Sequence, residues 1–77
     1  MRERITFDKL TPKFQQRLKE LMFALYVLKG YDDPEGRIKE KLAPKKHSKK
    51  KWARMRWEYM LAIDRQRVKL GLSKIHS

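Results

Sequence analysis

The stretch KKHSKKKWARMRW, residues 45–57, gathers five lysines, two arginines and two tryptophans and contains no acidic residue. Lysine and arginine side chains displace condensed counterions from a nucleic-acid backbone, so this cluster predicts phosphate binding that weakens steeply with salt. A solvated linker is the simpler interpretation, but cations in the first turn of a helix oppose its dipole unless an anion binds there. We therefore predict a nucleic-acid contact surface formed by Lys45, Lys46, His47, Lys49, Lys50, Lys51, Arg54, Arg56 and Trp57.

The whole chain is strongly basic, with a formal net charge of +12 on 77 residues. An excess of this size attracts nucleic acid or anionic membranes. The apolar fraction of 40% is too high for a wholly disordered basic tail, so we expect a folded body that carries a basic region. Residues 1–77 form one small domain, which buries only about 60% of the surface of its unfolded chain. The sequence has no cysteine, so disulfides and thiolate zinc sites are excluded.

Few other residues have types and spacing that suggest chemistry. His47 and His76 have no carboxylate at ligand spacing, so we expect them to contact solvent or phosphate rather than a metal. Helix capping accounts for Asp33 and Glu35 without a metal or an acid–base pair. The sequence contains no glycine-rich phosphate loop, nucleophile elbow or HExxH motif. We therefore expect no enzymatic activity, no cofactor and no metal.

Three helices must position these residues. Each expected start carries a capping side chain, and two of the starts continue with proline, which suits the first helical position. The predicted helices span residues 12–29, 34–43 and 49–70, beginning after Thr11, Asp33 and Ser48 and ending at Gly30, Pro44 and Gly71. The simplest architecture is all-α, with the first and third helices packed as an antiparallel hairpin and the short second helix crossing one end.

The remaining segments are an N-terminal arm, residues 1–10, a lysine-rich linker, residues 44–48, and a tail, residues 72–77. Apolar and polar side chains alternate weakly in the arm, which indicates extended backbone. A lone strand has no pairing partner in this sequence, so we expect the arm to lie over the helices or over a partner. For the tail, folding back onto the body and fraying both stay open.

Two of the predicted helices are apolar on more than one side. In the third helix, Trp52 and Ile63 share one face, and a second stripe that begins at Trp57 lies roughly 160° away. So small a domain cannot cover every such face itself, which favours a protein partner or a second copy. Base stacking on Trp57 is the alternative, ranked slightly lower because aliphatic residues continue the stripe. The predicted partner interface consists of Trp57, Leu61, Val68, Phe23 and Val27.

No apolar run approaches the roughly 18 to 20 residues that cross a bilayer, and the longest, LMFALYVL at residues 21–28, has eight. The N-terminal sequence MRERITFDK lacks the apolar core of a secretory signal. We therefore expect no membrane span, and a location in the cytoplasm or in another compartment that holds nucleic acid.

These features favour a non-enzymatic nucleic-acid-binding protein, with RNA preferred over DNA, such as an RNA-associated or ribosome-associated accessory protein. One alternative is a dimeric viral or chromosomal DNA-binding protein. The linker before the third helix is longer than the three or four residues of a helix-turn-helix, which disfavours it. Another alternative is an assembly subunit or small viral inhibitor that binds an acidic protein through the apolar faces.

Overall fold

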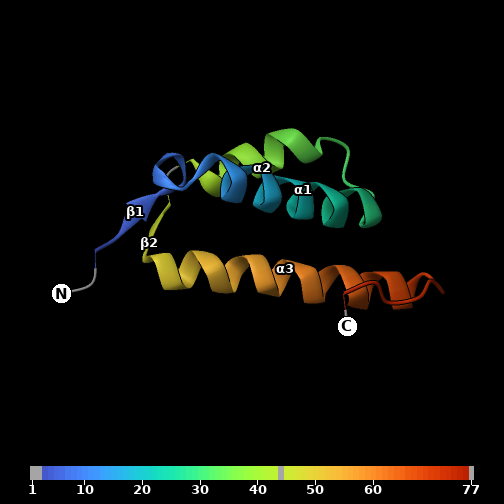
Figure 1. The fold of residues 1–77 in the computed structure, drawn as a ribbon. Coiled ribbons are helices and arrows are strands. Elements are labelled where there is room, and N and C mark those ends of the chain that lie inside the picture. The colour runs from blue at the N-terminus through green and yellow to red at the C-terminus, as the bar shows by residue number, and fades with distance from the viewer. Residues whose placement is uncertain (1–2, 44, 77) are drawn as a thin grey trace.

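The computed structural model describes residues 3–43 and 45–76, which form three α-helices and a small two-stranded sheet (Figure 1). The elements in chain order are β1 Ile5–Thr6, a 3₁₀ helix Phe7–Lys9, α1 Pro12–Leu28, α2 Pro34–Leu42, β2 Lys46–His47 and α3 Lys49–Lys69. The prediction of a mostly helical chain with three helices is confirmed, and each helix ends one residue before its predicted end. The predicted helix stop at Pro44 lies outside the described residues.

The helices begin and end at local signals that the sequence carries. At each start, the capping side chain accepts a hydrogen bond from the backbone N–H three residues on, which satisfies a donor that the helix leaves free. These capping residues are Thr11, Asp33 and Ser48. Gly30 and Gly71 follow α1 and α3 with φ of 79° and 81°, a left-handed conformation that glycine adopts without strain.

The predicted antiparallel hairpin is wrong, because α1 and α3 run in the same direction (Figure 1). Contacts between the two helices advance together along both. The guanidinium of Arg56 lies over the Phe14 ring, 5.4 Å from its centroid, and further along both helices the Tyr26 and Tyr59 hydroxyls are 3.2 Å apart. The reason is α2, whose nine residues span about 13 Å and return the chain toward its starting end. Each consecutive pair of helices is antiparallel, so the first and third are parallel.

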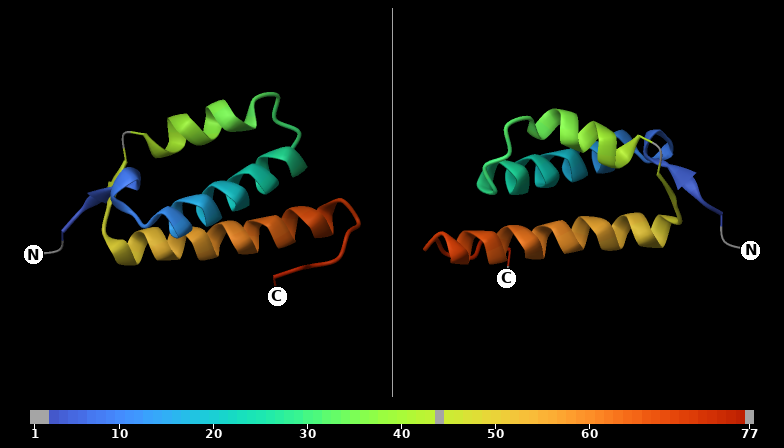
Figure 2. Two further views of the ribbon diagram at one scale, coloured as in Figure 1. Left: turned by 45° about the horizontal axis from the view of Figure 1, so that its top comes forward. Right: turned by 180° about the vertical axis from the view of Figure 1, so that it is seen from behind.

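The N-terminal arm forms a strand that the sequence did not predict. Ile5–Thr6 pairs antiparallel with Lys46–His47, so the expectation that this segment lacks a pairing partner is wrong. Part of the expected linker, residues 44–48, is therefore β2. The pairing is possible because the parallel helices bring the segments that lead into α1 and α3 to the same end of the molecule (Figure 2). The indole Nε1 of Trp52 donates a hydrogen bond of 3.0 Å to the Ile5 carbonyl and fixes β1 to α3.

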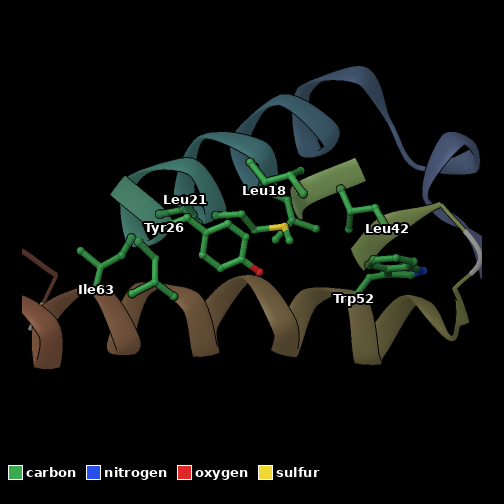
Figure 3. Close-up of a cluster of buried hydrophobic side chains, with 9 residues drawn as sticks. Leu18, Leu21, Tyr26, Leu42, Trp52 and Ile63 are labelled. Carbon is green, nitrogen blue, oxygen red and sulfur yellow. The ribbon is translucent and has the colours of Figure 1, made fainter. Parts of the chain in front are cut away.

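The core lies between α1 and α3 (Figure 3). The second helix, α2, packs beside α1 and contributes Ile38 and Leu42 to this core. Its buried apolar side chains are Leu18, Leu21, Met22, Leu25, Tyr26, Ile38, Leu42, Trp52 and Ile63. Trp52 is fully buried, and the rings of Phe7 and His47 contact it edge-on. The indole thus joins α3 to both strands and carries much of the packing at this end of the core.

The C-terminal tail folds back along α3 (Figure 2). The buried carboxylate of Asp64 accepts hydrogen bonds from the backbone N–H groups of Ile75 and His76 at 3.0 and 3.1 Å. His76 Nδ1 lies 3.3 Å from the same carboxylate, so the expectation that His76 contacts solvent or phosphate is wrong. A buried carboxylate needs such donors, and the tail supplies them.

Candidate nucleic-acid interface

An ordered strand–helix junction holds the predicted lysines on the surface. β2 and the residue before it present the first two, and Ser48 caps α3 directly afterwards, which places the other three in the first turn of that helix. All five are exposed: Lys45, Lys46, Lys49, Lys50 and Lys51. Because Trp52 follows at once and is fully buried, this part of the basic stretch is anchored to the core rather than free in solution.

The next turns of α3 extend this surface. Arg54, Arg56 and Trp57 are exposed, and Trp57 as a whole residue is 55% exposed to solvent. The cation–π contact of Arg56 with Phe14 orients its guanidinium along the junction of α1 and α3. We call the seven lysines and arginines of residues 45–57 the basic surface.

His47 is half-buried and differs from its neighbours. Its ring lies edge-on to Trp52, with 4.8 Å between ring centroids. Burial, and then the positive charges of Lys51, Lys45 and Arg4, lower the pKa of His47 below its usual value of 6.5. The imidazole is therefore mainly neutral near pH 7, where it packs the junction and adds no full charge to the basic surface.

The seven cations of the basic surface form no ion pair with a carboxylate within the part of the chain that the structure describes. The ion pair found there joins Arg17 to Glu20, at 4.0 Å, and the ring nitrogen Nδ1 of His76 lies 3.3 Å from Asp64. The positive charge of the basic surface is consequently open to an external anion.

Tertiary structure adds cations that sequence reasoning missed. The pairing of β1 with β2 brings Arg4 close enough to His47 to influence its pKa. Lys13 and Arg56 line a depression of about 510 Å³ beside the start of α1, which Arg17 and its partner Glu20 also line. The weak alternation in the arm was the only sequence signal for Arg4, whereas the position of Lys13 beside Arg56 depends on the parallel course of α1 and α3.

The predicted partner residues lie on two different surfaces. Trp57 and Val68 are exposed on α3, and Leu61 between them is half-buried. Phe23 and Val27 are exposed on α1, where Phe23 lines a groove of about 890 Å³ between α1 and α2. None of the three α3 residues lines this groove. The structure therefore does not bring the five residues together into one interface.

Among the residues that the structure describes, no group of three or more histidine, aspartate or glutamate side chains is arranged to hold a metal ion. In the described part of the chain, no helix combines the length and the apolar character that a bilayer crossing requires. Comparisons with protein-family models, with curated proteins and with solved structures find no match. Among the described residues, the basic surface and the two apolar surfaces are candidate functional features.

Proposed function

We propose that this protein binds nucleic acid without catalysis, through the basic surface and the adjacent Arg4. The supporting observation is the set of seven cations on an ordered junction, none paired with a carboxylate within the described residues. Lysine and arginine side chains that contact phosphates release the counterions condensed on the nucleic acid. Binding to such a surface therefore gains entropy irrespective of base sequence.

The helix dipoles reinforce this surface. Since α1 and α3 are parallel, their N-terminal ends lie at the same end of the molecule (Figure 1). Neither helix has an acidic residue in its first turn. Each N-terminal end carries a partial positive charge, and here those charges are not offset locally, so they add to the attraction for phosphate.

RNA is the nucleic acid that we favour. Unpaired bases stack on exposed aromatic side chains beside arginine, and Trp57 and Arg54 offer this combination on α3. The connection from Leu42 to Lys49 contains β2 and is longer than a helix-turn-helix turn, so major-groove docking of α3 in that manner is disfavoured. An accessory protein bound to a structured RNA, such as ribosomal RNA, fits these properties.

Filter binding of single-stranded RNA and duplex DNA, side by side across a salt series, tests the proposal. We expect binding of both at low salt, tighter binding of RNA, and a loss of affinity by orders of magnitude toward physiological salt. Failure to bind either polymer at low salt would refute the proposal and favour an acidic protein as the partner. Preference for duplex DNA would refute the RNA assignment alone.

A further inference from the structure

A pocket of about 400 Å³ is lined by residues of all three helices and adjoins the basic surface at Lys45. Its volume falls within the range of about 300–1,000 Å³ that is typical of small-ligand pockets. Three of its lining residues are the tyrosines Tyr26, Tyr31 and Tyr59. Four others are cations and only Glu40 is acidic, so the lining carries a net formal charge of +3. Aromatic rings beside cations suit a nucleotide, which joins a flat base to an anionic phosphate.

The turn after α1 holds the tyrosine rings in place. Gly30 adopts the left-handed conformation, and the backbone N–H of Tyr31 then donates a hydrogen bond of 3.1 Å to the Tyr26 carbonyl. The centroids of these two rings are 5.2 Å apart. Tyr59 of α3 meets Tyr26 edge-on, with 6.3 Å between centroids. The aromatic wall is thus formed by the fold itself, which lowers the cost of ordering it around a ligand.

Arg37 of α2 extends this wall. Its guanidinium carbon lies over the Tyr31 ring, 4.0 Å from the centroid, and Arg37 is exposed. No carboxylate of the described residues forms an ion pair with it. A guanidinium is planar, so one that covers a ring on one side can carry a base on the other, and bases of unpaired RNA stack on such planes.

Two hydroxyls in the pocket offer a hydrogen-bond donor. The Tyr26 and Tyr59 hydroxyl oxygens are 3.2 Å apart, and the Tyr26 side chain reaches toward α3 (Figure 3). One of the two protons serves this hydrogen bond, and no further acceptor within residues 3–43 and 45–76 takes the other. Burial, and then the hydrogen bond to Tyr26, raise the pKa of Tyr59, so its hydroxyl stays protonated. The pair can therefore donate a hydrogen bond to an oxygen of a base or a ribose.

We propose that this pocket binds one unpaired nucleotide of RNA, with its base stacked on Arg37 and its phosphate at Lys45. The inference rests on the proposed function, because it assigns the site at which the same RNA is read. Lys45 belongs to both the pocket and the basic surface, so a strand bound along residues 45–51 leads directly to the pocket. The phosphate lies at this end, away from Lys29 at the C-terminal end of α1. A base inside a duplex is already stacked, so the pocket selects unpaired RNA.

Two polymers with the same phosphates provide the test. Isothermal titration calorimetry at low salt measures the binding of a uridine oligomer of about eight nucleotides and of the matching ribose–phosphate chain without bases. The starting protein is Trp57→Ala, because the exposed Trp57 ring is the other platform offered to bases. We expect this protein to bind the uridine oligomer about tenfold or more tightly than the chain without bases, which is the gain from one stacked base.

A conservative change of Arg37 then separates stacking from charge. Arg37→Lys in the same background keeps the positive charge and removes the planar guanidinium. It should lower the ratio of the two affinities to about one and leave the salt slope unchanged. The matched control, Arg65→Lys, changes an exposed position of α3 outside the pocket lining and should keep the ratio.

The possible failures are distinct. Equal affinity for the two polymers before Arg37 is changed would overturn the inference and leave phosphate contact at the basic surface in place. A ratio that survives Arg37→Lys would also overturn the inference alone. Failure to bind either polymer would refute the proposed function together with it.

Nuclear magnetic resonance spectra of the isotope-labelled wild type give a second readout that needs no variant. The backbone amide signals of Tyr31 and Arg37 should shift when the uridine oligomer is added and should not shift with the chain that lacks bases. Shifts confined to residues 45–57 would overturn the inference. Uridine monophosphate distinguishes a free nucleotide from RNA: if it saturates these shifts at a lower concentration than the oligomer does, the assignment to RNA is overturned.

Discussion

Replacing Lys49, Lys50 and Lys51 together by alanine should flatten the salt dependence of nucleic-acid binding. The three side chains are exposed in the first turn of α3, where cations oppose the helix dipole. Alanine is also the best helix former, so the change should not lower the free energy of unfolding. The variant thus removes three of the seven cations of the basic surface and keeps the fold.

The expected size follows from the number of phosphates contacted. Each neutralised phosphate contributes about 0.7 to the log–log salt slope for a single strand and about 0.9 for duplex DNA. Seven contacts give slopes of about −5 for RNA and −6 for DNA, and four contacts give about −3 and −4. Between 50 and 200 mM salt, RNA affinity should therefore fall roughly a thousandfold for the wild type and only about fiftyfold for the variant.

The control removes the same charge from the other end of the molecule. Lys29, Lys69 and Lys74 are exposed, and along α3 Lys69 lies about 30 Å from Lys49 and about 20 Å from Arg56, the nearest cation of the basic surface on that helix. These distances are about two to three times the screening length of about 10 Å at 0.1 M salt. Replacing these three by alanine should leave the slope nearly unchanged. Equal flattening by both triple variants would refute a local site, and no flattening by either would refute phosphate contact at the basic surface.

Three further predictions concern the fold. Trp52→Ala should lower the free energy of unfolding by about 3–5 kcal/mol, because it empties a fully buried site. Urea unfolding measures this, and Trp57→Ala, at an exposed position, should change the same quantity by less than about 0.5 kcal/mol; equal losses would contradict the core described above. Asp64→Ala should release the tail, so hydrogen exchange at the backbone amide of His76 should accelerate, whereas retained protection would argue against this carboxylate as its anchor. Because the pKa of His47 is lowered in the fold, the unfolded chain gains protons first as the pH falls through about 6.5, so stability is full above that value and declines below it. His47→Gln should therefore lose less stability than the wild type between about pH 7 and pH 5, measured by urea unfolding, and equal losses would refute this role.

The helix boundaries were predictable because their signals are local. A capping oxygen reaches a backbone N–H only three residues away, as Thr11 and Ser48 do here. A glycine such as Gly71 ends a helix through its own φ. The separation of the faces follows from helical geometry in the same way, which is why Trp52 and Trp57 were predicted on different faces of the third helix; the structure buries Trp52 and exposes Trp57.

The direction of the third helix could not be read from such signals. An amphipathic pattern specifies which face is buried and is the same for either direction of the helix axis. The direction depends on how far α2 and the following residues carry the chain back, and on the pairing of β1 with β2. Each strand has only two residues, too few for periodicity to reveal. The contact of Asp64 with the tail is likewise tertiary, since eleven residues separate it from Ile75.

The sequence predicted the lysines and arginines of the candidate site but not every residue that lies beside them. The lysines of residues 45–51 lie together because they are adjacent in sequence, and their exposure follows from the cost of burying a charge. Arg4 and Lys13 join them only through the fold, because their helices and strands converge at one end. A count of charges along the sequence therefore finds the lysines of residues 45–51 and misses Arg4 and Lys13, which only the fold brings beside them.

The parallel arrangement of α1 and α3 also separates the basic surface from the acidic start of α2. In an antiparallel hairpin, the negative C-terminal end of α1 would lie beside the first turn of α3 and partly offset its lysines. The observed course instead places both positive helix ends beside β2, while the antiparallel α2 starts at the far end with Asp33 and Glu35 (Figure 1). The proposed phosphate contacts at one end of the molecule and the acidic start of α2 at the other thus depend on one feature, the return of the chain through α2.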